Sequence, residues 1–428
     1  MKKTVAFLLV LCLLLAPLLS ACGGGKTPAD TATETRETIA SSAPDEETSA
    51  SPQPEIKLEQ LTVGGEALSE FTIIYARNSY YKVINQFNNN TQKLIVNDYD
   101  FDRLTAERLA ALLKERFGVA LEVKQDSNVK TPGAHEILIG NTNRNLHTAD
   151  LAADQFEVRL TTNERKLVIC GGAYGTTWHA IDALEAWLEG QEAERKTAAD
   201  FTAAANVAGT HHLTRIACVG DSITAGTGAT DREYTSYPAN LQRVLWKDAI
   251  VTNYGNGGKT MRDDLADSYY KTTTYADLIA NPEPFDLVLL MLGTNDSSRD
   301  SGTWTTTADD RFITSCHHIL RGIKAMSPDM KVLMMNCPKC YRSGETGVPA
   351  SPHVVALQTQ TAKKMLQKGY SLALYDMHTL SQDKIGSANF PDSLHPNDAG
   401  YVIMANEIAA AVRAYLNGTT NSYFISLD

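Results

Sequence analysis

The chain has 428 residues, 43% of them hydrophobic, and a formal net charge of −11. This length is enough for two domains, and the hydrophobic content is typical of a soluble protein with a packed core. The acidic balance and the lack of any basic cluster argue against nucleic acid as a partner.

The chain begins with Lys2 and Lys3 followed by the apolar run 6–19, which is too short and too broken by proline to span a membrane comfortably. The residues that follow, Leu-Ser-Ala-Cys at 19–22, resemble the bacterial lipobox. This resemblance implies a lipoprotein signal peptide over residues 1–21 and acylation of Cys22. The mature protein would then be held by lipid on the extracytoplasmic face of a bacterial cell membrane. The alternative is an ordinary secretory signal.

Residues 22–57 are predicted to form a disordered tether. They are rich in Gly, Thr, Ser, Ala, Pro and Glu, contain no aromatic residue and almost no large aliphatic one. Such a segment cannot bury enough apolar surface to fold, so it is expected to lift the folded part away from the membrane.

Residues 58–200 are predicted to form an α+β domain. Strand-like and helix-like hydrophobic patterns follow one another here, and Gly118 is expected to end the first helix. The predicted strands are 71–76, 119–123, 135–140, 156–161 and 166–172, and the predicted helices are 103–118 and 175–190.

Three stretches of this domain, EILIGNTNR, FEVRLTTNERKLVICGG and YGTTWHAIDALEAWL, resemble the small α/β domain that precedes the catalytic barrel of hexosaminidase-type and glucuronidase-type glycoside hydrolases. In that family the domain is an accessory. No barrel is predicted after it here, so its role is left open, with a spacer or packing role as the simplest interpretation.

Small and polar residues over 195–212 indicate a connection, and residues 201–212 are taken as the linker to a second domain over 213–418. In this second domain strands and helices alternate, which predicts a parallel sheet with helices on both faces. The predicted strands are 213–220, 249–255, 285–293, 331–336 and 371–377, and the predicted helices are 236–246, 308–326, 353–368 and 397–416.

Four polar clusters lie where these predicted strands end, the place where open parallel sheets form their sites. One of them contains Ser222 and another contains Asp392 and His395. A serine hydroxyl becomes a nucleophile when a base takes its proton, and histidine is the natural base near neutral pH. Asp392 stands three residues before His395 and could hold its other ring nitrogen. The pattern predicts Ser222, His395 and Asp392 as a catalytic triad for acyl transfer.

A developing oxyanion could be bound by the backbone N–H groups of Ser222 and Gly258 and by the side-chain amide of Asn295, the last two from the remaining clusters. Gly255 or Gly257 could replace Gly258 in this role. Two further sets of residues are assigned as well: Asn256 and Tyr254 are predicted to contact substrate, and Asp221 and Asp296 are expected to brace their loops.

The blocks GDSIT, the glycine of NYGNGGKT, GTND and DSLHP, in this order, resemble the SGNH (GDSL-type) hydrolase family over residues 213–415. The resemblance implies a flavodoxin-like three-layer α/β/α fold and metal-free ester hydrolysis without a cofactor. It also implies the same roles for Ser222, Gly258, Asn295, Asp392 and His395.

The stretch from Lys259 to Ser297 is similar to carbohydrate acetylesterases, which favours an acylated glycan as substrate. A lipase, lysophospholipase or thioesterase is the alternative within the same family, and a glycan-binding surface lipoprotein is the non-enzymatic alternative. Cys337 and Cys340 have a redox or zinc spacing without a second pair, so no metal site is predicted; whether they form a disulfide is left open. The oligomeric state is not predicted.

Overall fold

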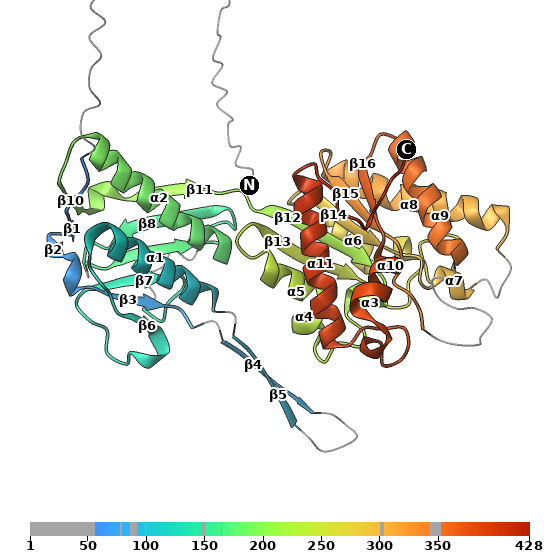
Figure 1. Ribbon diagram of the computed structural model, residues 1–428, viewed down its shortest axis with the longest axis horizontal. Coiled ribbons are helices and arrows are strands. Elements are labelled where there is room, and N and C mark those ends of the chain that lie inside the picture. The colour runs from blue at the N-terminus through green and yellow to red at the C-terminus, as the bar shows by residue number, and fades with distance from the viewer. Residues whose placement is uncertain are drawn as a thin grey trace, which may run out of the picture. The chain divides into compact units, whose positions relative to one another are not determined.

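The N-terminal and C-terminal folded regions are each built on a six-stranded sheet (Figure 1). The predicted signal peptide, Cys22 and all but the last two residues of the predicted tether lie outside the described residues. The computed structural model describes residues 56–77, 79–85, 92–98, 100–144, 146, 150–163, 165–299, 304–341 and 352–428.

The main sheet of the N-terminal domain has the order β11-β8-β9-β7-β3-β6, in which β6, β3, β7 and β9 are parallel. A smaller sheet, β10-β1-β2, and a hairpin of β4 and β5 complete the domain. The strands are β1 Gln60–Val63, β2 Glu66–Ala67, β3 Thr72–Tyr75, β4 Ser79–Asn85, β5 Gln92–Asp98, β6 Val123–Gln125, β7 Glu136–Ile139, β8 Gln155–Leu160, β9 Leu167–Gly171, β10 Ala198–Phe201 and β11 Val207–Thr210.

Two long helices, α1 (Phe101–Phe117) and α2 (Tyr174–Ala193), pack on one face of this main sheet. Their apolar residues, spaced by three or four positions, join one cluster with side chains of β3, β7 and β9. Helix α1 ends at Gly118, whose φ of 68° is readily available only to glycine. The expectation that Gly118 stops the helix is therefore correct, and both helices fall close to their predicted bounds.

Two predictions for this domain differ from the structure. Residues 119–122 are irregular rather than strand, and β6 begins only at Val123. Residues 195–212, expected to be a connection, contain β10, which pairs in parallel with β1, and β11, which pairs with β8. Small side chains make a weak strand signal on their own, and the partners that stabilise these strands lie far away in the sequence.

The C-terminal domain contains the sheet β13-β12-β14-β15-β16-β17, parallel throughout except for the last strand. The five parallel strands coincide with the five predicted ones to within three residues at either end. The strands are β12 Thr214–Gly220, β13 Ala249–Gly255, β14 Leu287–Met291, β15 Lys331–Met335, β16 Ser371–Tyr375 and β17 Phe424–Ile425.

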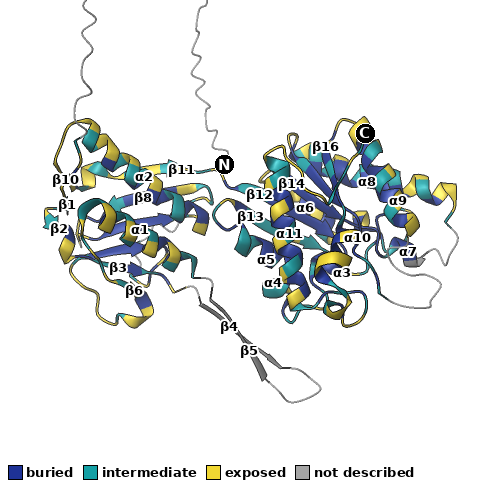
Figure 2. Cartoon of the chain, viewed as in Figure 1, coloured by how far each residue is buried: buried dark blue, intermediate teal, exposed yellow. Residues whose placement is uncertain are grey.

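Helices cover both faces of this sheet (Figures 1 and 2). Helices α5 and α11 join one apolar cluster with the sheet, and α6, α8 and α9 join the other. All five residues of β14 are buried, as expected for a central strand covered on both sides. The predicted flavodoxin-like α/β/α fold is confirmed. The helices are α3 Ser222–Ala225, α4 Arg232–Thr235, α5 Tyr237–Val244, α6 Thr273–Ala280, α7 Asp296–Arg299, α8 Thr306–Met326, α9 Pro352–Gln367, α10 Met377–Leu380 and α11 Asp398–Leu416.

Strand β13 is an edge strand whose outer side is partly closed by a glutamine of α5. The side chain of Gln242 donates to the carbonyl of Ala249 at 3.0 Å and accepts the N–H of Val251 at 2.7 Å. One amide group thereby occupies the donor and the acceptor that a neighbouring strand would use.

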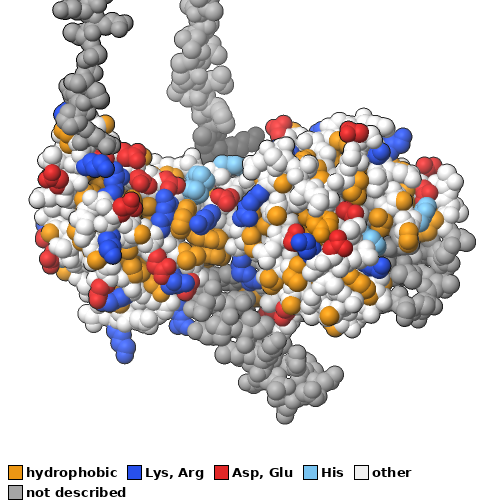
Figure 3. All heavy atoms as spheres, in the orientation of Figure 1, with side chains coloured by type: hydrophobic (Ala, Val, Ile, Leu, Met, Phe, Trp, Pro, Cys, Tyr) orange, Lys and Arg blue, Asp and Glu red, His pale blue; other side chains and the backbone are white. Residues whose placement is uncertain are grey.

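Three further observations concern the surface charge, the cysteines and the apolar character of the helices. On the face seen in Figure 3, acidic and basic side chains are interspersed and neither gathers into one large patch. Cys170, Cys218, Cys316, Cys337 and Cys340 are all buried free thiols, so the pair left open by the sequence is not bridged. In the part of the chain that the structure describes, no helix combines the length and the apolar character needed to cross a membrane.

The N-terminal domain holds a buried ion cluster centred on Glu136 at the start of β7. Its carboxylate contacts Arg144 at 2.9 Å and Lys166 at 2.7 Å, and the Glu136 side chain is only 2% exposed. Burial alone would raise the pKa of Glu136, but hydrogen bonds from Arg144 and Lys166 hold it below its ordinary value. The ionised form of Glu136 is therefore the one that stabilises the fold.

Replacing Glu136 with Gln should lower the free energy of unfolding by about 3–5 kcal/mol at pH 7, because two buried cations lose their counter-charge. A folded-state pKa below the unfolded one means that this contribution is present above about pH 4.5 and is lost as the pH falls further. Urea melts of both proteins between pH 3 and 7 measure the difference, which should shrink with acidification. A difference in the free energy of unfolding that does not change with pH would contradict the conclusion that the ionised form of Glu136 stabilises the fold.

Candidate active site

Strand β12 places Ser222 two residues beyond its last position. Gly220 stands opposite Gly255 of β13 and Met291 of β14, so the three strands end level. A Cβ on Gly220 would lie 2.1 Å from the Thr224 hydroxyl, so only glycine allows the chain to turn there. Asp221 then caps α3 by accepting the N–H of Ile223 at 3.0 Å. Ser222 is thereby the first residue of a short helix at the rim of the sheet.

The three predicted triad residues form one continuous chain of hydrogen bonds. The Ser222 hydroxyl lies 2.9 Å from Nε2 of His395, and Nδ1 of His395 lies 2.6 Å from the carboxylate of Asp392. Ser222 is 8% exposed, so the residue as a whole is shielded from most of the solvent. The contacts join residues 173 positions apart in the sequence.

A tight turn sets the distance between Asp392 and His395. The second carboxylate oxygen of Asp392 accepts the backbone N–H groups of Leu394 at 3.0 Å and His395 at 2.6 Å. Between them Ser393 has a φ of 67°, a conformation that non-glycine residues seldom adopt, and its carbonyl accepts the N–H of Tyr341 at 2.8 Å. The turn is therefore held by contacts that offset its backbone strain.

This turn also fixes the charge of Asp392. Partial burial would raise its pKa, but the hydrogen bonds from the backbone and ring of His395 hold the pKa below its ordinary value. Asp392 is consequently ionised at neutral pH, and its carboxylate holds Nδ1 of His395 and thereby orients the ring.

The glycines that follow β13 have different surroundings. A Cβ on Gly255 would lie 2.2 Å from the backbone N of Ala225, so Gly255 permits close packing on α3. A Cβ on Gly257 would lie 3.9 Å from Cβ of Ser222, which places this residue beside the serine. Gly258 has a φ of 73° with nothing within 4 Å of its Cβ position. Its conformation requires glycine, and the space beside it is open.

Asn295 and Asn256 are fixed by backbone contacts near the same rim. The Asn295 side-chain nitrogen donates to the carbonyl of Lys259 at 3.0 Å, which sets the plane of its amide. The Asn256 backbone N–H donates to the carbonyl of Gly220 at 2.9 Å, while its side chain donates to the Thr274 hydroxyl at 2.7 Å. Asn256 thus ties the loop after β13 to β12 and to α6.

Tyr254 lies on the side of β13 that packs against the core. Its ring contacts Phe285 edge-to-face at 5.7 Å, and its hydroxyl accepts a hydrogen bond from the side chain of Asn281 at 3.1 Å. These contacts give Tyr254 a structural role in the packing of the domain. The predicted substrate contacts of Tyr254 and Asn256 stay predictions.

Asp398, which the sequence reasoning did not single out, joins the serine side of the site to the histidine side. Its carboxylate accepts the N–H of Thr230 at 2.7 Å, the hydroxyl of Thr235 at 2.8 Å, and the hydroxyl of Thr230. The threonines lie in the segment after α3, and Asp398 follows His395 by three residues. In the sequence, an acid in the first turn of a helix indicates only where the helix starts. The local pattern around Asp398 therefore does not predict its contacts with Thr230 and Thr235.

Gly228 was also missed. Its φ is 93°, and a Cβ there would lie 2.4 Å from the carbonyl of Pro396 and 3.0 Å from Cβ of His395. The serine-side segment therefore passes directly against the histidine turn. Among the described residues, no group of three or more His, Cys, Asp or Glu side chains is placed to hold a metal ion.

Residues 218–403 match the family model described as "GDSL-like Lipase/Acylhydrolase family". The chain is 28% identical over 221 residues to an acetylxylan esterase of Xylanibacter ruminicola, an alignment that covers 46% of this chain and 43% of that protein. The chain thus aligns with less than half the length of this curated relative. The matched residues lie within the predicted second domain, and the match agrees with the GDSL-type resemblance of its motifs.

Two solved structures are similar to this chain as well. One is a family two carbohydrate esterase from Clostridium thermocellum in complex with cellohexaose, at 18% identity and a TM-score of 0.37, covering 49% of this chain and 67% of that one. The other is a carbohydrate acetylesterase family member from Sinorhizobium meliloti, at 19% identity and a TM-score of 0.37, covering 48% and 100%.

Replacing Asp398 with Ala should slow covalent labelling of Ser222 by a fluorophosphonate about tenfold, because about 1–2 kcal/mol of contacts between the two halves of the site are lost. Labelling rates by intact-protein mass spectrometry check this. The matched control is Asp310→Ala, an exposed acid on α8, which should label like the wild type. Unchanged labelling of a folded Asp398→Ala protein would show that this contact does not position the serine.

Proposed function

We propose that the protein is a serine esterase that removes acetyl or other small acyl groups from carbohydrate. The observation that carries the proposal is the hydrogen-bonded chain of Ser222, His395 and Asp392 at the level ends of β12, β13 and β14. The family match of the surrounding domain and the acetylxylan esterase relative support the reaction and the substrate class.

In the proposed mechanism, Nε2 of His395 takes the proton of the Ser222 hydroxyl as Oγ attacks the ester carbonyl. The tetrahedral oxyanion is stabilised by the N–H groups of Ser222 and Gly258 and by the Asn295 amide. His395 then gives its proton to the leaving alcohol, which leaves an acyl-serine. Water attacks this ester as His395 accepts its proton, and the acid departs while the proton returns to Ser222.

The N-terminal segment supports a location for this activity. We propose that Cys22 carries the lipid anchor and that the tether holds the esterase outside the cell, where acylated polysaccharide is encountered. The N-terminal α/β domain is proposed as an accessory of the carbohydrate-active type on the basis of its sequence resemblance alone.

The substrate proposal is tested with p-nitrophenyl esters of increasing chain length and with acetylated xylan. Wild-type protein should prefer the acetyl ester and release acetate from the xylan. Ser222→Ala should lose at least about 10³-fold in kcat, because the nucleophile is gone while the binding surface remains. Equal rates in both proteins would rule out the nucleophile, and a maximum at long chains would favour a lipase.

The structure offers a matched control for the histidine. His318 on α8 contacts Asp263 through Nδ1 at 2.7 Å, much as His395 contacts Asp392. His395→Ala should abolish activity, whereas His318→Ala should stay within about threefold of the wild type, since it removes an Asp–His pair outside the proposed triad.

The anchor is tested by expressing the full chain and Cys22→Ala in a bacterial host supplied with radioactive palmitate. The wild-type protein should incorporate the label and sediment with membranes, and the variant should do neither, because the proposed attachment atom is absent. Secretion of unlabelled wild-type protein into the medium would instead indicate an ordinary secretory signal.

A further inference from the structure

The segment after β13, residues 256–268, carries the proposed oxyanion donor Gly258 and has little regular structure of its own. We call it the oxyanion loop. A donor in such a segment is aimed only if the backbone around it is fixed, because oxyanion stabilisation depends on donors placed before charge develops. The contacts made to the backbone of this loop next to Gly258 therefore decide how well the donor works.

Two consecutive residues after β14 hold the backbone of the oxyanion loop. Asn295 donates to the carbonyl of Lys259 at 3.0 Å. The carboxylate of Asp296 accepts the N–H of Met261 at 2.8 Å through one oxygen and the N–H of Arg262 at 3.0 Å through the other. Three peptide groups within five residues of Gly258 are thereby fixed from one neighbouring segment.

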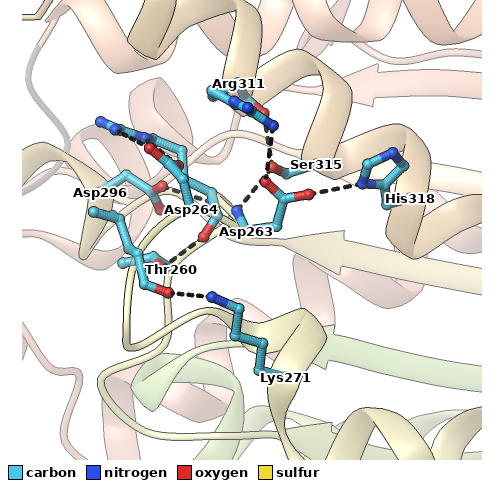
Figure 4. Close-up of polar contacts among 10 residues, drawn as sticks. Thr260, Asp263, Asp264, Lys271, Asp296, Arg311, Ser315 and His318 are labelled. Atoms are coloured by element: carbon cyan, nitrogen blue, oxygen red, sulfur yellow. Dashed lines mark hydrogen bonds and ion pairs between the residues drawn. The ribbon is translucent and has the colours of Figure 1, made fainter.

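Asp296 is unusual among the three carboxylates in this region (Figure 4). The side chains of Asp263 and Asp264 belong to the oxyanion loop and contact other side chains, Asp263 that of His318 at 2.7 Å and Asp264 that of Arg262 at 2.7 Å. Asp296 comes from a different segment, is fully buried, and points toward the loop backbone. A buried carboxylate is costly unless it is hydrogen-bonded, so this placement indicates a specific use.

We propose that Asp296 is a positioning residue for the oxyanion hole, which acts by holding the backbone of residues 261–262 and through it the N–H of Gly258. The inference rests on the proposed function and adds a residue to it. Asn295 directly precedes Asp296 in the chain. The side-chain donor of the oxyanion hole and the carboxylate that holds the loop backbone therefore come from the same turn, and both depend on one backbone position.

The charges that face Asp296 bear on this role. Burial raises the pKa of Asp296 to about 6, while the N–H bonds from Met261 and Arg262 lower it. The charged or titratable side chains that face it are Arg262 of the loop, Asp221 beyond β12 and Cys337 beyond β15. Protonation of Asp296 would turn one of its two accepting oxygens into a hydroxyl donor. Holding both backbone N–H groups of the loop therefore needs the ionised form.

The test compares Asp296→Asn with Asp263→Asn and Asp264→Asn on p-nitrophenyl acetate at pH 8. An amide keeps one accepting oxygen and turns a donor toward the other N–H, so only Asp296→Asn should release the loop backbone. Its kcat should fall about 30-fold to 100-fold with KM within threefold, as expected when transition-state donors are misplaced by a fraction of an ångström. The two loop variants should stay within threefold in both parameters.

Two measurements separate positioning from general loss of structure. The inhibition constant of a boronic acid that forms a tetrahedral adduct on Ser222 should rise in proportion to the loss of kcat/KM. In an Asn295→Ala background, Asp296→Asn should cost less than fivefold, because both changes damage the same oxyanion hole. If Asp296→Asn does not fold by thermal melting, Asp296→Ser, whose hydroxyl still accepts one hydrogen bond, is measured in its place.

A folded Asp296 variant with kcat within threefold of the wild type would overturn the inference. So would a loss that is undiminished in the Asn295→Ala background, or a boronic acid that binds as tightly as before. Failure of the proposed function is distinguishable, because it would show as wild-type activity in Ser222→Ala, whereas failure of this inference leaves Ser222→Ala inactive and Asp296→Asn active.

Discussion

The candidate site depends on the level ending of three parallel strands. Gly220 of β12 pairs with Gly255 on one side and Met291 on the other, so the segments that leave these strands begin at one height above the sheet. Ser222, Gly258 and Asn295 each follow within four residues. A shift of one residue in either pairing would move a whole segment along the strand direction by about 3.3 Å and turn its side chains to the other face.

The carboxylates around the site serve different purposes according to their surroundings. Asp392 is half exposed and faces the ring of His395. Asp221 and Asp296 are fully buried and accept backbone N–H groups, and burial raises the pKa of each to about 6. Asp398 binds the two threonines that lie beyond α3. Aspartate thus has four uses around the site: it orients a base, caps a helix, fixes a loop and joins two segments. The geometry of each position decides which use applies.

The sequence was sufficient for the five parallel strands and for the meeting of Ser222, His395 and Asp392, because buried strands leave long apolar runs and the polar motifs stand just beyond them. It was insufficient where a residue's partner is remote. No residue near Gly228 in the sequence indicates that the carbonyl of Pro396 leaves no room for a Cβ there. Likewise, no residue near Asp398 indicates its hydrogen bond with Thr230. Residues 198–201 become a strand only because β1 lies alongside.

The glutamine on α5 has a consequence for how copies of the protein meet. Gln242 occupies hydrogen-bonding groups on the open side of β13, and the opposite end of the sheet is closed by β17, a strand of two residues running against its neighbour. Exposed strand edges are the usual template by which sheets of separate molecules join. One border of this sheet is partly covered by a side-chain amide and the other ends in a short antiparallel strand, which leaves fewer backbone groups free to pair with a strand of another molecule.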